Sequence, residues 1–156
     1  MEKSLISRLK EFLAEKIVES ANPSKRRIFI KVLPENLPDT IQILKEKTGF
    51  THLSTITGVD KGETFEILYH FANKIAVLTV RTEVPAGKPE IKTITKIIPG
   101  AILYERELQD MFGIKVMEIP DPRPLILPDG WPEGNYPLRK NWKYQRPEEI
   151  IPGGGK

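Results

Sequence analysis

The sequence predicts an α+β domain with a largely antiparallel sheet and helices on one face, followed by an extended proline-rich tail. The apolar residues change between helical and alternating spacing in the order helix, strand, helix and three strands, which favours this class. The 156 residues, 29% of them charged and 39% hydrophobic, suit one folded domain plus an extension. Because the composition changes after residue 117, we divide the chain into a domain over 1–117 and a tail over 118–156.

The first helix is expected over residues 4–20, where apolar side chains recur at helical spacing until Asn22-Pro23 interrupts them. The bases Lys25-Arg26-Arg27 follow. Bases of this kind can contact phosphate, but we interpret them as the solvated entrance of a strand that begins at Ile28.

A second helix is expected between Asn36 and Gly49. Asn36 can cap it, with Asp39 three residues later in the manner of a capping box. Glycine is a common helix terminator, so Gly49 is expected to end this helix. The stripe that should face the core consists of Leu37, Ile41 and Leu44.

Three strands are expected next, over 50–59, 63–71 and 74–84, because these segments are rich in β-branched and aromatic residues. The middle strand alternates strictly, so its apolar residues should share one face: Phe65, Ile67, Tyr69 and Phe71. A proline- and glycine-containing loop over 85–89 should follow, and then a short helix over 91–101.

The helix over Tyr104–Phe112 is the segment around which the rest is organised. At about 100° per residue it has a compact apolar face and a charged remainder, and Gly113 supplies a stop. Arg106 and Asp110 have the spacing of an intrahelical ion pair. Glu105 and Glu107 diverge by about 200° on the helix, so they cannot flank one bond as glycosidase carboxylates do.

No other catalytic constellation is present in the sequence. It lacks a phosphate-binding glycine motif and a nucleophile elbow. It also contains no cysteine, which excludes disulfides and conventional iron–sulfur ligation, and only two histidines, His52 and His70. We therefore expect a chain without a cofactor or metal that is not an enzyme on its own.

The tail is unusual because it combines many prolines with large apolar groups. It holds eight of the 14 prolines and both tryptophans. Disordered linkers are poor in large apolar side chains, whereas proline pre-extends the backbone and lowers the entropy lost on ordering. We therefore expect the tail to lie in a groove on another protein, with apolar anchors at Leu125, Ile126, Leu127, Trp131, Tyr136, Leu138, Trp142 and Tyr144.

Three fragments in this order, ERELQDMFGI, PDPRPLILPDGW and YPLRK, resemble the signature region of the complex I "30 kDa" subunit family. That family also occurs in energy-converting nickel–iron hydrogenases and formate hydrogenlyases. The resemblance is sharp over 99–142, and over 28–84 only the order of elements supports it. Respiratory members usually have Gly-His-Pro before the first tail arginine and a second arginine after it. Here the residues around Arg123 are IPDPRP, which looks closer to the hydrogenase-type branch.

The resemblance implies a scaffold subunit without a redox centre. Such a subunit is peripheral, on the cytoplasmic side of the membrane, and clasps the catalytic large subunit and the iron–sulfur subunits of its complex. It would touch the membrane only through the complex. Taken with the anchors above, the resemblance leads us to expect partner-interface roles for Glu105, Arg106, Glu107, Asp110, Arg123, Trp131, Tyr136, Arg139, Lys140 and Trp142.

Two alternatives stay open at this point. The first is the equivalent subunit of a respiratory NADH- or F420H2-quinone-type dehydrogenase. The second is a small nucleic-acid-binding protein, because LRKNWKYQR interleaves bases with aromatic rings. Six bases against six acids in the tail, and an acid-rich helix before it, argue against nucleic acid.

Overall fold

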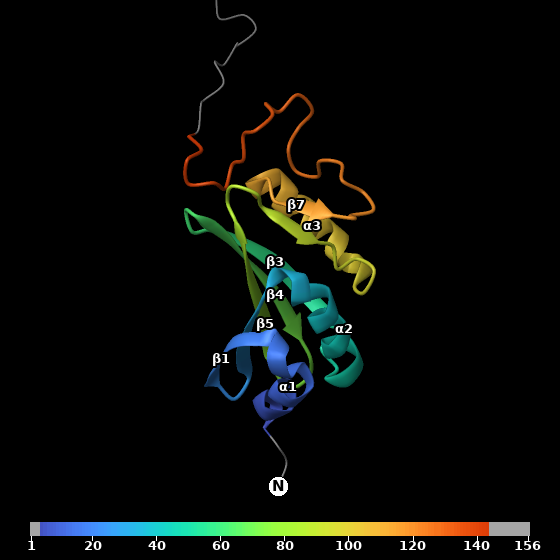
Figure 1. Ribbon diagram of the computed structural model, residues 1–156. Coiled ribbons are helices and arrows are strands. Elements are labelled where there is room, and N and C mark those ends of the chain that lie inside the picture. Colours follow the sequence, from blue (N-terminus) through green and yellow to red (C-terminus); the bar gives the residue numbers. More distant parts are fainter. Residues whose placement is uncertain (1–3, 144–156) are drawn as a thin grey trace, which may run out of the picture.

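The computed structural model describes residues 4–143 and contains one five-stranded sheet, three α-helices and a small two-stranded sheet in that range (Figure 1). The large sheet has the strand order β1-β2-β5-β4-β3, and only the β2–β5 pair is parallel. The largely antiparallel α+β class is thereby confirmed. The expected anchor Tyr144 and the glycines at 153–155 lie outside the described residues.

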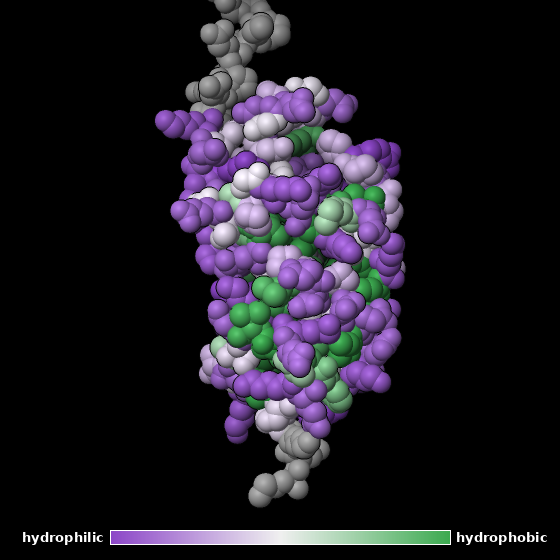
Figure 2. Space-filling view, in the orientation of Figure 1, coloured by the Kyte–Doolittle hydropathy of each residue, from purple (hydrophilic) through white to green (hydrophobic). Residues whose placement is uncertain are grey.

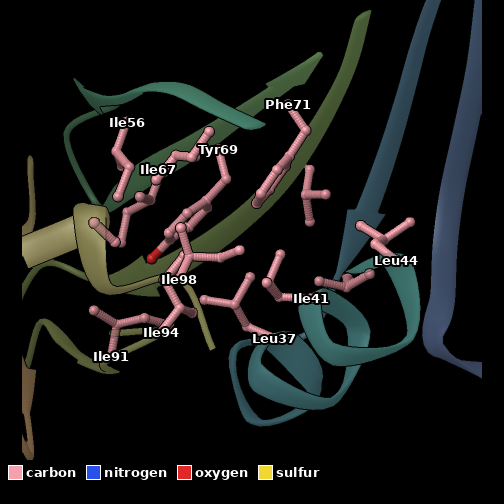
Figure 3. Packing of buried hydrophobic residues seen from close by; sticks show 14 of the residues in the cluster. Leu37, Ile41, Leu44, Ile56, Ile67, Tyr69, Phe71, Ile91, Ile94 and Ile98 are labelled. Atoms are coloured by element: carbon pink, nitrogen blue, oxygen red, sulfur yellow. The ribbon is translucent and has the colours of Figure 1, made fainter. Parts of the chain in front are cut away.

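The sheet consists of β1 (Ile17–Ser24), β2 (Arg27–Val32), β3 (His52–Asp60), β4 (Thr64–Ala72) and β5 (Val77–Pro85). The predicted alternation of β4 is confirmed, because Phe65, Ile67, Tyr69 and Phe71 are each at most 2% exposed. Helix α2 (Leu37–Lys47) covers this face with the predicted stripe of Leu37, Ile41 and Leu44, all buried, and Ile41 lies between the helix and Phe71 (Figure 3).

The first helix is shorter than expected. Helix α1 spans Leu5–Leu13, a 3-10 turn follows, and the rest of the expected helix over 4–20 is strand β1. The backbone leaves the helix at Ala14, whose φ is 34°, and the β-branched pair Ile17-Val18 favours a strand. Pro23 lies within β1, which is tolerated because β1 is an edge strand of the sheet.

Two further local expectations are corrected. Asn36 does occupy the N-cap position of α2, but its side chain makes no capping hydrogen bond, and the Thr40 hydroxyl donates to its carbonyl instead. The helix expected over 91–101 is replaced by strand β6 (Glu90–Lys92) and a 3-10 turn over Pro99–Ala101. Ile91 pairs with Val116 of β7 (Lys115–Met117), so sheet pairing overrides the helical pattern.

Helix α3 spans Ile102–Phe112, and Gly113 ends it in the left-handed conformation, as predicted. Leu108, Met111 and Phe112 are buried, and Phe112 meets Phe65 of β4 edge to face with ring centroids 6.0 Å apart. The helix therefore packs against the sheet through its predicted apolar face, and its charged flanks lie along the path that the chain takes after β7.

We expect Tyr69→Phe to leave the free energy of unfolding unchanged or to raise it by up to about 1 kcal/mol. Within the described range the Tyr69 hydroxyl is buried without a hydrogen-bond partner, and burial followed by the charge of Glu105 raises the pKa of this phenol. Denaturant unfolding measures the effect. Ile67→Ala, on the same face of β4, should lose about 2–5 kcal/mol. A clear loss in Tyr69→Phe would reveal a partner for the hydroxyl.

Candidate partner interface on α3 and the tail

Glu105 is fully buried inside its own domain. Its carboxylate accepts a hydrogen bond from the Thr93 hydroxyl at 2.6 Å and another from the Ile94 amide at 2.7 Å, while Thr93 also contacts Thr95. Burial raises the pKa of Glu105, against the lowering effect of these two bonds. The structure thus gives Glu105 the role of fixing α3 to the segment after β6, with no exposed surface for a partner.

Arg106 and Asp110 do not pair with one another in the described structure. Arg106 donates from Nε to the carbonyl of Arg123 at 2.8 Å and from its Nη2 atom to that of Pro124 at 3.0 Å. It also forms an ion pair with Asp121 at 3.4 Å. The expected intrahelical pair is therefore replaced by contacts to the start of the tail.

Asp110 completes this first attachment of the tail. One oxygen of its buried carboxylate accepts hydrogen bonds from the successive amides of Leu125, Ile126 and Leu127, at 2.8, 2.7 and 3.2 Å. Three amides converging on one anion need a curled backbone, so this segment is not fully extended. Arg106 and Asp110, one turn apart on α3, hold residues 121–127; we name this set of contacts the first clamp.

A second clamp joins the end of α3 to residues 136–140. The Leu138 amide donates to the Met111 carbonyl at 3.1 Å, and Arg139 donates from Nε to the Phe112 carbonyl at 2.6 Å. The Arg139 guanidinium lies over two aromatic rings, 5.0 Å from the centroid of Phe65 and 4.4 Å from that of Tyr136. Helix C-termini attract cations, so this placement of Arg139 is favourable.

Gly113 makes the second clamp sterically possible. Its φ is 68°, and a methyl group on its Cα would overlap the Tyr136 ring. The clamp extends to the β3–β4 turn, where the Lys140 amide donates to Asp60 at 2.8 Å. This bond, together with one from the Gly62 amide, lowers the pKa of Asp60.

Between the clamps the tail forms a loop that carries Trp131. Its ring stacks on that of Trp142, with centroids 6.4 Å apart and an angle of 30°. With Tyr136 and Arg139 the two rings line a hollow of about 550 Å³. These contacts lie within the tail, whereas the two clamps hold it on its own domain, which corrects our expectation that the tail lies in a groove on another protein.

Only some of the residues expected at the partner interface have exposed side chains. The Arg123 side chain is 80% exposed, although it holds Asp121 at 2.7 Å and thereby lowers the pKa of that carboxyl. Lys140 is exposed, and Glu107 is half-buried with no polar partner in the described range. The tail also exposes three aliphatic side chains: Leu125, Ile126 and Leu138.

Sequence reasoning missed the partners that the tail finds on its own domain. Asp60 lies 80 residues from Lys140, and Phe65 lies far from Arg139, so no local pattern links them. The sequence predicts Gly113 only as a helix terminator, which is half of its role. The described residues contain no group of three potential metal ligands among His, Cys, Asp and Glu.

A family model described as "Respiratory-chain NADH dehydrogenase, 30 Kd subunit" matches residues 30–148, which include the sheet from β2 onward, α3 and both clamps. The chain belongs to this family. The match confirms the resemblance inferred from the signature fragments. The match also includes strands β2 to β5, where only the order of the elements had suggested the family.

The relatives of this chain differ in length. The chain is 33% identical over 142 residues to formate hydrogenlyase subunit 5 of Escherichia coli, covering 87% of this chain but 25% of that one. It is 31% identical to a subunit of the F(420)H(2) dehydrogenase of Methanosarcina mazei, covering 90% and 91%. Identity to the membrane-bound hydrogenase subunit beta of Pyrococcus furiosus is 29%, over 91% and 84%.

The fold is similar to that of a chain in the membrane-bound sulfane sulfur reductase, an archaeal respiratory membrane complex. The TM-score is 0.79 at 27% identity, and the match covers 89% of this chain and 84% of that one. This coverage exceeds the 1–117 domain, so the structural likeness includes part of the tail.

We expect Gly113→Ala to destabilise the protein more than Gly49→Ala. Both glycines have positive φ, 68° and 73°, and a left-handed alanine costs about 1–2 kcal/mol. Only at position 113 does the methyl group also meet Tyr136, so the second clamp should open and amide exchange over 136–140 should accelerate. Denaturant unfolding and hydrogen exchange measure the two effects. Equal losses in both variants, with unchanged exchange, would contradict this close approach.

We expect Glu105→Gln to remove a pH dependence of stability. The folded pKa of Glu105 is raised, so its contribution is complete below the unfolded pKa of about 4.3 and is lost as pH rises through the folded pKa. A glutamine can accept from the Ile94 amide through its oxygen and donate to the Thr93 hydroxyl through its NH2 group, without ionising. Unfolding free energies measured across the acidic range should therefore fall less steeply with rising pH than in the parent. Parallel curves would show that Glu105 does not titrate as a buried acid.

Proposed function

We propose that the chain is a peripheral subunit, without a cofactor of its own, of a membrane-bound multisubunit oxidoreductase related to hydrogenases and complex I. In this proposal α3 and the tail clasp the catalytic large subunit and the iron–sulfur subunits. The subunit itself is not catalytic, and the complex couples electron transfer to ion translocation. The observation that carries the proposal is the family match, together with relatives named as subunits of a membrane-bound hydrogenase and of a dehydrogenase.

The same domain occurs as a separate chain and as one quarter of a longer one. In the longer relative the remaining three quarters are covalently tethered to the domain, which gives the two parts a high effective concentration. A relative that occurs as a separate chain, such as the F(420)H(2) dehydrogenase subunit, lacks this tether and must hold any corresponding polypeptide through its surface. This difference among the relatives supports a large partner subunit, and with it an interface on the domain that this chain shares with them.

The α3–tail region supports the proposal as the place of that interface. The two clamps order the described tail in advance, which reduces the entropy lost on binding. Arg106, Asp110, Tyr136 and Arg139 would act by holding the tail. The groups that would touch partners are the half-buried Glu107, Trp131 and Trp142 and the exposed Arg123, Lys140, Leu125, Ile126 and Leu138.

The proposed location is the cytoplasmic side of the membrane. Across residues 4–143 no helix is long and apolar enough to cross a bilayer, and relatives carry names of membrane-bound complexes. The IPDPRP sequence around Arg123 favours the hydrogenase-type branch over a quinone reductase, and the F420H2 dehydrogenase relative keeps the second branch as the alternative.

We expect Leu138→Ser to weaken assembly while leaving the melting temperature of the isolated chain nearly unchanged. Leu138 is 54% exposed on the tail, so its apolar surface is free to dock. Val18→Ser is the matched control, because Val18 is also 54% exposed but lies on edge strand β1. A tagged full-length chain incubated with membranes of its source cells, then purified, measures assembly through the co-purified large and iron–sulfur subunits.

Two outcomes would contradict the proposal. If no oxidoreductase subunit co-purifies with the parent chain, the proposed function is wrong. If Leu138→Ser and Val18→Ser assemble equally well, the tail is not part of the interface. Iron in the eluate should stay with the partners when the chain is separated from them.

A further inference from the structure

The end of the sheet opposite the second clamp carries a separate cluster of cations. The turn over 24–27 contains Lys25, Arg26 and Arg27, and the turn over 73–76 contains Lys74, all of them exposed. The turns lie side by side, because Arg26 donates from Nε to the Ile75 carbonyl at 3.0 Å and accepts at its own carbonyl from the Val77 amide at 2.9 Å. The parallel pairing of Arg27 with Val77 aligns them.

None of these four cations forms an ion pair with a carboxylate in the described structure, whereas Lys31 and Arg81 farther along the same strands both do. The turns over 24–27 and 73–77 and the neighbouring segment 49–52 contain no Asp or Glu. The formal net charge of the whole chain is only +3, so this end is basic although the protein as a whole is nearly balanced.

An apolar surface lies between the cations. Ile75 is 65% exposed, more than any other large hydrophobic side chain in the described range, and Val77 is 43% exposed. The turn that presents Ile75 is ordered, because the Asn73 side chain accepts hydrogen bonds from the amides of Ile75 and Ala76, both at 2.8 Å. The exposure is therefore a property of a fixed turn.

Ile75 borders a shallow hollow of about 630 Å³. The hollow lies between the start of β3 and the end of β4, and its other lining residues are Gly49, Thr51, His52, Ala72, Asn73 and Lys74. Apolar patches also break the polar surface over the lower half of the molecule, around α1 and β1, as Figure 2 shows. This end therefore combines a shallow hollow, with Lys74 and Ile75 in its lining, and three further cations on the neighbouring turn over 24–27.

We propose that this hollow docks an acidic segment of another protein chain, with an apolar side chain in the hollow and carboxylates on Lys74 and on the cations of the neighbouring 24–27 turn. Cations without carboxylate partners beside an apolar hollow match such a segment in charge, and charge complementarity mainly sets partner choice and association rate. The proposal depends on the proposed function only in that the chain must have protein partners. It concerns a surface remote from α3 and the tail.

Two other occupants fit less well. A bilayer surface is met by apolar side chains that protrude into it, and a hollow would leave unfilled space there. A single-stranded nucleic acid is usually bound by a basic groove with several aromatic rings on which bases stack. The two turns have none, Phe50 of segment 49–52 is fully buried, and His52 is the one exposed ring of that segment.

The absence of native cysteine provides a site-specific test, because each introduced cysteine is the sole thiol of the chain. Thr51→Cys, on the rim of the hollow, carries a benzophenone photo-crosslinker in the full-length chain. Gly87→Cys, in the exposed loop after β5 where a side chain has free space, is the control. Each labelled chain is incubated with membranes of its source cells and irradiated, and the crosslinked peptide is identified by mass spectrometry.

The expected result is an adduct of position 51 with one segment of another polypeptide that is rich in Asp and Glu around an apolar residue. Lys25→Glu with Lys74→Glu should reduce this adduct to the level seen without irradiation, as should Ile75→Ser and high salt. The pair Lys88→Glu and Lys92→Glu makes the same change of charge elsewhere on exposed positions and should leave the adduct intact.

Several results would overturn the proposal: no adduct at position 51, adducts with lipid or nucleic acid only, a segment without carboxylates, or an adduct insensitive to the charge reversal. Purification of the tagged chain from the same membranes separates the two proposals. If oxidoreductase subunits co-purify but position 51 forms no adduct, only the proposed docking surface is contradicted. If no partner co-purifies, the proposed function and the docking surface are both contradicted. Unchanged melting temperatures of the substituted chains exclude misfolding as the cause.

Discussion

Asp110 accepts three successive backbone hydrogen bonds at one carboxylate oxygen, and the path of the chain after β7 depends on this interaction. A buried anion without partners is costly, so the three amides of the tail stabilise Asp110 as much as Asp110 orders them. Arg106, one turn earlier, binds the carbonyls just before those amides. The two oppositely charged side chains thus recognise opposite polar groups of one short segment.

The end of α3 supplies a second fixed point by different means. Its last carbonyls have no partners within the helix, and the Leu138 amide and the Arg139 side chain satisfy two of them. The Arg139 guanidinium also lies over the rings of Phe65 and Tyr136. Because Gly113 has no side chain, Tyr136 can lie directly against the backbone where the helix stops.

A protein that orders its own binding segment gains in two ways. In the proposed interface, the residues that would meet partners are presented in a defined arrangement, and residues such as Glu105 and Asp110 would be essential without touching the partner. Charged motif residues of this kind are easily interpreted as contact residues. Here the polar atoms of α3 are largely used within the chain, and the outward surface is made of simpler aliphatic and basic groups.

The sequence by itself determined the class of the fold, the strict alternation of β4, the stripe of α2 and the helix that ends at Gly113. These depend on local periodicity and on the conformational preference of glycine, which are properties of neighbouring residues. The fragments around α3 likewise identified the family. Only the tertiary structure decided that residues 17–24 form an edge strand and that Ile91 pairs with Val116. It alone decided that Arg106 and Asp110 bind the tail instead of one another. Strand pairing and desolvation depend on which segments meet in space, and contacts such as Lys140 with Asp60 join residues too far apart in the chain for any local pattern to specify.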